Sequence, residues 1–157
     1  MPRKYTSTPP EIRFWAKVNK NGPIANPKLD RCWIWTGAKN DDGYGAFTPI
    51  IPRPQLRAHR YAYELTIGPI PSGLTLDHLC FVRHCVRPSH LEPATSRANI
   101  LRGQGRAAVN ARKTHCIRGH ELSGGNLIFN SKTSSRHCRI CKVAGDKRRK
   151  ELKHSPA

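Results

Sequence analysis

Acidic residues and aliphatic side chains are scarce in this chain of 157 residues. Only 10 residues are Asp or Glu, against 28 Lys or Arg, and the formal net charge is +18. Leu, Ile, Val and Phe together supply about one residue in five, a share close to that of disordered chains. Apolar burial alone therefore predicts a thin core. Three Trp, four Tyr and six Cys nevertheless indicate a folded chain that is stabilised in part by cross-links.

A long apolar run is also missing. The N-terminal stretch MPRKYTSTPPEIRFW lacks the apolar centre of a signal peptide, and no later stretch is long enough to span a membrane. We therefore expect an intracellular protein without a membrane partner. In a reducing compartment six cysteines are more often metal ligands than disulfides, so zinc is the expected cross-link.

Positive charge is concentrated in the last third of the chain. Fourteen Lys or Arg and two acids lie between Arg97 and Lys150. This asymmetry is typical of a surface that binds a polyanion, and it favours nucleic acid over a basic face that only aids solubility.

Periodicity and turn residues predict an α+β chain. The predicted helices are PPEIRFWAKVNKNG, which ends near Gly22, RAHRYAYELTIG, which ends at Gly68, and TSRANILRG, which Thr95 or Ser96 can cap. A β-hairpin is predicted around the NDDG turn, between Trp33–Trp35 and Tyr44–Phe47, and short strands are predicted at LTLDHL, HLEPAT and NLIF.

Two close pairs of ligand-type residues lie near the C-terminus, at Cys116-x3-His120 and Cys138-x2-Cys141. Such pairs can close a tetrahedral zinc site, and residues 115–145 therefore resemble a zinc ribbon. His115 and His137 are rival ligands, which we rank lower because neighbouring side chains rarely point at one ion. We expect a basic linker at 104–114, with a helix from Arg106 to Lys113 as an alternative, and a charged tail at 146–157.

The remaining cysteines predict a second zinc site. Cys80, Cys85 and His90 follow one another at equal spacing, and Cys32 is the cysteine left to be the fourth ligand. His84 is the competing fourth ligand. A structural zinc site can contribute on the order of 10 kcal/mol to folding, which would offset the thin core.

Once these ligands are set aside, Asp77, His78 and Asn99 remain. The segments DHLC, CVRPSHLE and SRANILRG resemble phage-type HNH endonucleases of the ββα-metal superfamily. The spacing of Cys80, Cys85 and His90 is similar to that of the structural zinc in the His-Cys box homing endonucleases. The resemblance extends upstream through CWIWTG, DGYG and AHRYAYE. It implies a zinc-stabilised ββα-metal nuclease domain at 1–103, with its core motif at 76–103 and an N-terminal hairpin and helix.

The resemblance also implies roles for single residues. His78 would be the general base, a role that an imidazole suits at neutral pH. Asn99 would bind the catalytic Mg²⁺ or Mn²⁺ through oxygen, and Asp77 would be a second ligand, although the His-Cys box group has no equivalent of it. Arg57 or Arg60, with His59 nearby, would clamp the phosphate or the leaving group.

Together these features predict a metal-dependent DNA endonuclease with two structural Zn²⁺, a nicking or homing enzyme that leaves 5′-phosphate and 3′-hydroxyl ends. The alternative is a zinc-stabilised DNA-binding or regulatory protein without cleavage activity, and only Asp77, His78 and Asn99 favour the enzyme. RNA is disfavoured by the resemblance alone.

The expected partner is double-stranded DNA in a host cytoplasm, and the resemblance implies a phage or mobile-element origin. A double-strand break would need a homodimer or two successive cuts, because one active site cuts one strand. The residues expected to contact DNA are Lys39, Asn40, Tyr44, Arg57, Arg60, Arg102, Arg106, Arg112 and Lys113.

Overall fold

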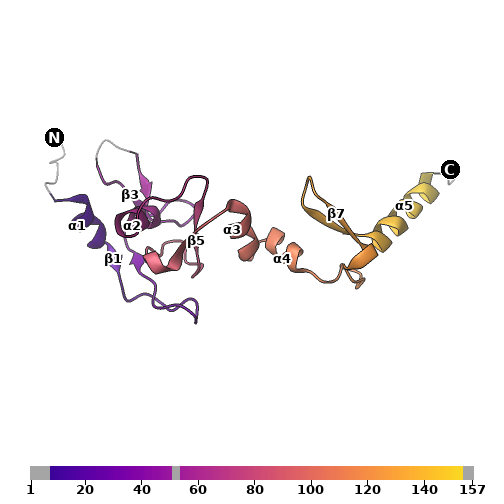
Figure 1. Ribbon diagram of the computed structural model, residues 1–157, viewed down its shortest axis with the longest axis horizontal. Helices are drawn as coiled ribbons and strands as arrows, with labels where there is room; N and C mark the ends of the chain where they lie inside the picture. The colour runs from indigo at the N-terminus through magenta and orange to yellow at the C-terminus, as the bar shows by residue number, and fades with distance from the viewer. Residues whose placement is uncertain (1–7, 51–53, 154–157) are drawn as a thin grey trace. The chain divides into compact units, whose positions relative to one another are not determined.

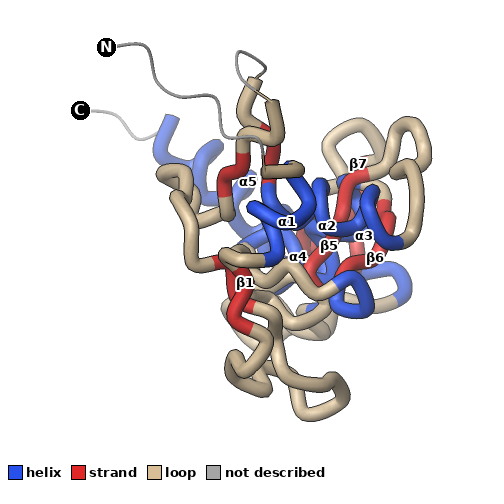
Figure 2. Tube along the Cα trace, turned by 90° about the vertical axis from the view of Figure 1, so that its left-hand side faces the viewer, coloured by secondary structure: helices blue, strands red, loops and turns tan. Residues whose placement is uncertain are grey.

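The computed structural model describes residues 8–50 and 54–153 as an α+β chain, in agreement with the predicted fold class. It divides into two compact units, Met1–Asn99 and Ile100–Ala157. The strands are short, they pair two by two in antiparallel fashion, and loops join them (Figure 2). In the first unit the elements are α1 (Pro10–Trp15), β1 (Val18–Asn19), β2 (Ile34–Trp35), β3 (Ala46–Phe47), β4 (Leu56–Arg57), α2 (Ala58–Thr66), β5 (Thr75–His78), η1 (Pro88–His90) and β6 (Leu91–Ala94).

The first helix is shorter than predicted. It ends at Trp15 instead of near Gly22, and the chain then enters β1, where Val18 lies opposite Trp35 of β2. The Lys17 carbonyl accepts hydrogen bonds from both the backbone N–H and the hydroxyl of Thr36, each at 2.9 Å. These contacts divert the backbone from the helix into a strand pair that the local pattern does not reveal.

The two segments that were predicted to form one hairpin, 33–35 and 44–47, are paired with other strands instead. Strand β2 pairs with β1, and β3 pairs with β4. The NDDG turn is closed locally by an isolated bridge between Lys39 and Gly45 and by backbone hydrogen bonds from Asn40 to Tyr44 and from Ala46 to Ala38. The other edge of β2 is occupied by the loop before η1, because the Trp35 N–H donates to the His84 carbonyl and the Val86 N–H donates to the Trp33 carbonyl. Strand β2 therefore has no free edge for β3.

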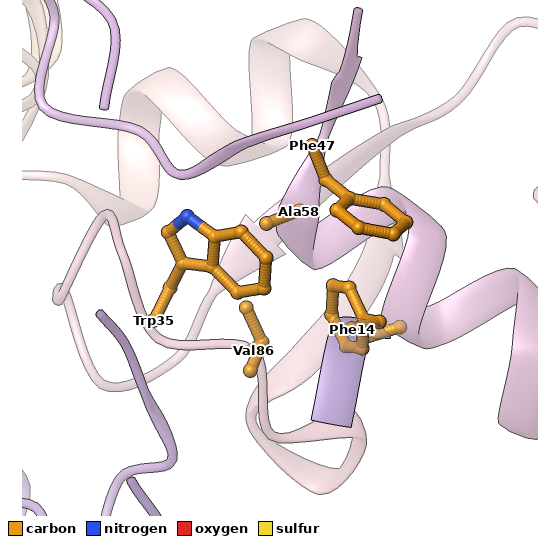
Figure 3. Close-up of a cluster of buried hydrophobic side chains, with 6 residues drawn as sticks. Phe14, Trp35, Phe47, Ala58 and Val86 are labelled. Carbon is orange, nitrogen blue, oxygen red and sulfur yellow. The ribbon is translucent and has the colours of Figure 1, made fainter. Parts of the chain in front are cut away.

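The main core of the first unit is a small aromatic cluster (Figure 3). The rings of Phe14 and Trp35 stack with centroids 4.9 Å apart, and Phe47 meets Phe14 edge-on at 5.1 Å. A Cβ at Gly45 would lie 2.6 Å from the Trp35 ring, so only glycine permits the approach of this strand to the indole. Aromatic area thus replaces the missing aliphatic side chains.

The predicted strand, loop, strand and helix around the motif are present. Strands β5 and β6 pair with His78 opposite Leu91, and α3 (Ser96–Arg102) follows them (Figure 1). The Thr95 hydroxyl accepts a hydrogen bond from the Ala98 N–H, so Thr95 caps α3 as predicted. Helix α2 ends before Gly68, whose φ of +129° suits glycine.

The second unit contains α4 (Arg106–Arg112), η2 (Gly124–Asn126), β7 (Leu127–Asn130), β8 (Ser135–Cys138) and α5 (Arg139–Lys153). Helix α4 lies in the segment where a linker or a helix was expected. The Arg136 guanidinium donates to the carbonyls of Asn110, Ala111 and Lys113 at the end of α4. Helix α5 carries residues 146–153, which were predicted as a charged tail, and residues 154–157 of that tail lie outside the described residues.

Across residues 8–50 and 54–153, no helix has the length and apolar character that crossing a membrane requires.

Candidate active site and metal centres

The first unit brings the side chains of Cys32, Cys80, Cys85 and His90 together in its interior. All four are buried, and their ligand atoms lie within 4.8 Å of one another. His90 Nδ1 lies 3.7 Å from Cys32 Sγ and 3.6 Å from Cys85 Sγ. Ideal tetrahedral zinc ligation separates a sulfur from a nitrogen by about 3.5 Å, so the group could hold zinc.

Backbone pairing explains why Cys32 joins this cluster. The isolated bridge between Ile34 and Cys85 joins the chain just after Cys32 to the loop that holds Cys85. A hydrogen bond from the Leu79 N–H to the His90 carbonyl brings the two ends of that loop together. The rival ligand His84 lies in the same loop and is not a member of the group.

The three thiols of this cluster influence one another. The hydrogen bond with Cys85 lowers the pKa of the Cys80 thiol to about 5, and the same bond raises the pKa of Cys85. Burial raises the pKa of Cys32. Crowded sulfurs of this kind resist joint ionisation unless a cation lies between them, which fits a metal centre.

The second unit gathers Cys116, His120, Cys138 and Cys141 in the same manner. His120 Nδ1 lies 3.4 Å from Cys116 Sγ and 3.2 Å from Cys141 Sγ, and the sulfurs of Cys116 and Cys141 are 3.7 Å apart. Tetrahedral zinc separates two sulfurs by about 3.8 Å, so this group could also hold zinc. The rivals His115 and His137 instead hydrogen bond to the hydroxyls of Thr114 and Ser135.

His78 closes β5 and is 7% exposed. Its Nε2 lies 3.1 Å from the carbonyl oxygen of Cys85, which is a hydrogen-bond acceptor, so Nε2 carries the proton. Nδ1 is then the basic nitrogen of the neutral ring. Burial lowers the pKa of His78, which favours the neutral imidazole at neutral pH.

Two further rings pack around His78. His59, which is 3% exposed, meets it edge-on with centroids 4.7 Å apart, and the Tyr44 ring lies 5.4 Å from His59 and 5.9 Å from His78. The guanidinium of Arg57 lies 4.7 Å from the centroid of Tyr44. Sequence reasoning named Tyr44 only as a DNA contact and mentioned His59 only as a neighbour of the clamp. The buried Ala58 and Ala62, one turn apart on α2, are the signal that the start of this helix faces inward.

The expected oxygen ligands of the catalytic cation lie on the elements β5 and α3 of the HNH-like motif. Asp77 lies on β5 and is 6% exposed, and Asn99 lies half-buried on α3. A carboxylate and an amide oxygen suit a hard divalent cation, in contrast to the two sulfur-rich clusters. Arg60, the other candidate clamp, is half-buried on α2.

The residues expected to contact DNA lie in both units. Lys39 and Asn40 are exposed at the NDDG turn, where Asn40 Oδ1 accepts a hydrogen bond from the Tyr44 N–H. The predicted DNA contacts in the second unit are all exposed, namely Arg102, Arg106, Arg112 and Lys113. The Arg112 side chain also donates to the carbonyls of Leu101 and Gly103.

Comparison with known proteins agrees with this geometry. Residues 56–101 match a family described as HNH endonuclease. Protein 7.7 of Escherichia phage T7 is 34% identical over 71 residues, which make up 45% of this chain and 53% of that protein. The uncharacterized gene 5.3 protein of Enterobacteria phage T3 is 32% identical over 68 residues, or 41% of this chain and 67% of that protein. Protein 2.8 of phage T7 is 26% identical over 114 residues, or 73% of each chain.

The chain thus spans about half the length of protein 7.7 and two thirds or more of the other two relatives. No solved structure matches. The family match covers β4, α2, β5, β6 and nearly all of α3, which are the elements that carry Asp77, His78 and Asn99. From the matched motif and the phage relatives we conclude that the chain belongs to the HNH endonucleases.

Proposed function

We propose that this protein is a metal-dependent DNA endonuclease in which His78 activates the attacking water. The observation that carries the proposal is the hydrogen bond between His78 Nε2 and the Cys85 carbonyl. It fixes one tautomer and leaves Nδ1 as the nitrogen that accepts a proton. Such a buried histidine, in a segment that matches the HNH endonuclease family, supports catalysis over DNA binding alone.

In the proposed reaction, water attacks the phosphorus of a phosphodiester opposite the 3′ oxygen. Its proton passes to Nδ1 of His78, the bond between phosphorus and the 3′ oxygen breaks, and the 3′ oxygen takes up a proton from solvent. The products are a 5′-phosphate and a 3′-hydroxyl. A positioned base of this kind contributes about 10²–10⁴ to the rate.

Asp77 and Asn99 are the residues proposed to bind Mg²⁺ or Mn²⁺. Bound there, the cation would supply stabilisation of the negative charge that develops on the phosphate and the leaving oxygen. Arg57, held over the Tyr44 ring close to His78, is the better placed of the two candidate clamps, because Tyr44 joins it to the base.

The first zinc site has a direct part in this proposal. Cys85 supplies both a sulfur to the cluster and the carbonyl that orients His78. Zinc at this site would therefore hold the base in place as well as stabilise the domain. The second zinc unit and the basic helices around it would bind the DNA backbone.

Cleavage of supercoiled plasmid by the zinc-loaded protein tests the proposal. With Mg²⁺ or Mn²⁺ we expect nicked circles first, because one site cuts one strand, and linear product only later. His78→Ala and His78→Gln should lower the rate about 10²–10⁴-fold. His84→Ala is the matched control, since it removes another histidine of the same loop and should leave the rate within twofold.

Zinc content and circular dichroism would establish that each variant is folded. Equal cleavage by a folded His78→Ala protein would exclude His78 as the base. DNA binding without cleavage by the wild type under either cation would favour the non-enzymatic DNA-binding protein.

A further inference from the structure

A pocket of about 530 Å³ lies on the first unit, and its lining includes none of the proposed catalytic or zinc-binding residues. Trp15 and Trp33 form its apolar wall together with Ile67 and Pro88, and Lys20 and Arg87 bring two cations to it. Both indoles are half-buried, and their rings meet edge-on at 5.9 Å. Each therefore keeps part of its surface accessible to a ligand.

The cations of the pocket lie over the indole rings. Lys20 Nζ is 4.7 Å from the centroid of Trp33 and 5.8 Å from that of Trp15, and the Arg87 guanidinium is 5.6 Å from Trp33. Arg87 is fixed by the Asp30 carboxylate at 2.6 Å and by the Arg31 carbonyl at 2.8 Å. Its guanidinium is thus positioned before any ligand arrives, with its charge shared between Asp30 and the ligand, while Lys20 supplies the second cation.

A second hollow of about 490 Å³ shares Lys20 and Arg87 with the first and adds Ile24, Leu29, Arg31 and the Asp30 carboxylate that pairs with Arg87. The two cations therefore lie where both hollows meet. A ligand that fits these hollows would have an anionic group at the two cations and a flat apolar group next to it, against the indoles.

We propose that this pocket binds an unpaired nucleotide, with its base against Trp33 or Trp15 and its phosphate at Lys20 and Arg87. Stacking on indoles beside basic side chains is the chemistry by which proteins hold single-stranded nucleic acid. The other ligand of this kind is an acidic peptide with an aromatic side chain. The net charge of +18 and the HNH domain favour the nucleic acid.

This pocket goes beyond the proposed nuclease function and uses none of its residues. It would retain one strand where the duplex is open, outside the catalytic site. Loss of the pocket should therefore leave the chemistry of plasmid cleavage intact, and failure of either proposal can be recognised without the other.

Fluorescence titration of the zinc-loaded full chain with a thymidine tetranucleotide tests the pocket. We expect saturable quenching of tryptophan emission, since Trp15 and Trp33 line the site whereas Trp35 is buried in the core. Lys20→Ala and Trp33→Leu should each raise the Kd about 10-fold. Lys17→Ala removes the same charge from an exposed residue outside the pocket lining and should change the Kd less than twofold.

Equal weakening by Lys17→Ala and Lys20→Ala would overturn the proposal, because binding would then follow net charge alone. Absence of quenching, or tighter binding of an acidic aromatic peptide than of the tetranucleotide, would also overturn it. Because Trp33 contacts the core, zinc content and circular dichroism must show that Trp33→Leu is folded. Lys20 is exposed, so its variant tests the pocket without that risk.

Discussion

His59 is a buried histidine packed edge-on against His78, and its Nδ1 has no hydrogen-bond partner among the described residues. Burial, together with the neighbouring His78, Arg57 and Arg60, lowers the pKa of His59 to about 3. The ring is therefore neutral at neutral pH. It packs against His78 without adding charge beside the proposed base.

This environment predicts a specific dependence of stability on pH. Because the pKa of His59 is about 3 in the folded state and about 6.5 when unfolded, the unfolded chain binds an extra proton between these values. Above about pH 6.5 the His59 ring is neutral in both the folded and the unfolded state, so it does not change the free energy of unfolding there. As the pH falls toward 3, this site should lower the free energy of unfolding by up to about 1.4 kcal/mol per pH unit.

Urea unfolding of the wild type and of His59→Gln between pH 7 and pH 4 measures this contribution. Acid also affects the other histidines and the zinc ligands, so the difference between the two proteins is the informative quantity. The slope should be shallower in His59→Gln. Identical slopes would mean that His59 does not take up the proton on unfolding.

Spacing along the chain predicted both Cys/His groups that the fold brings together. It also predicted the two strands and the helix that carry Asp77, His78 and Asn99, whose catalytic roles stay a prediction. The spacing did not place His59 and Tyr44 beside His78, because their approach to this ring depends on how α2 and the NDDG turn pack against β5. Such tertiary contacts have no periodic signature.

At the scale of elements, sequence reasoning succeeded where a segment carries its own boundary signals. Helices α2 and α3 begin and end close to the predicted positions, since Gly68 and Thr95 mark their ends locally. It failed where an edge of β2 decides the pairing. Both edges of that strand are taken, by β1 and by residues 84–86, and both partners are distant in sequence from β2.

The two Cys/His groups predict independent zinc sites, because each lies wholly within one unit. Elemental analysis should find two zinc ions per wild-type chain. Cys85→Ser and Cys138→Ser should each retain one. Cys85→Ser should also lose plasmid cleavage, because without zinc the loop whose residue-85 carbonyl orients His78 is no longer held. His84→Ala and His137→Ala, which alter the rival ligands, should retain two zinc ions each.

Loss of both ions in either cysteine variant would show that the units do not fold independently. Full zinc content in Cys85→Ser would exclude the first group as a zinc centre. Chelation of the wild type should lower its unfolding temperature, since zinc binding of this kind contributes on the order of 10 kcal/mol to folding.

At the scale of the whole molecule, the high positive charge favours binding of a polyanion. A chain with a net charge of +18 and little aliphatic area repels itself, and a bound polyanion relieves that repulsion. Much of this charge lies in the second unit on α4 and α5, where helical structure holds the cations at regular intervals. These helices present a surface that can neutralise successive phosphates.

Affinity for duplex DNA should therefore fall steeply with salt. Contact with about 6–10 phosphates gives a slope of log K against log salt of about −5 to −9. Replacing the exposed Lys147 and Arg148 of α5 by alanine should make the slope shallower by about 1.8, whereas the same loss of charge at Lys17 and Lys28 should leave it nearly unchanged. Fluorescence anisotropy with a labelled duplex between 50 and 200 mM salt measures both. If the two pairs change the slope equally, DNA responds to net charge and not to the helix that carries it.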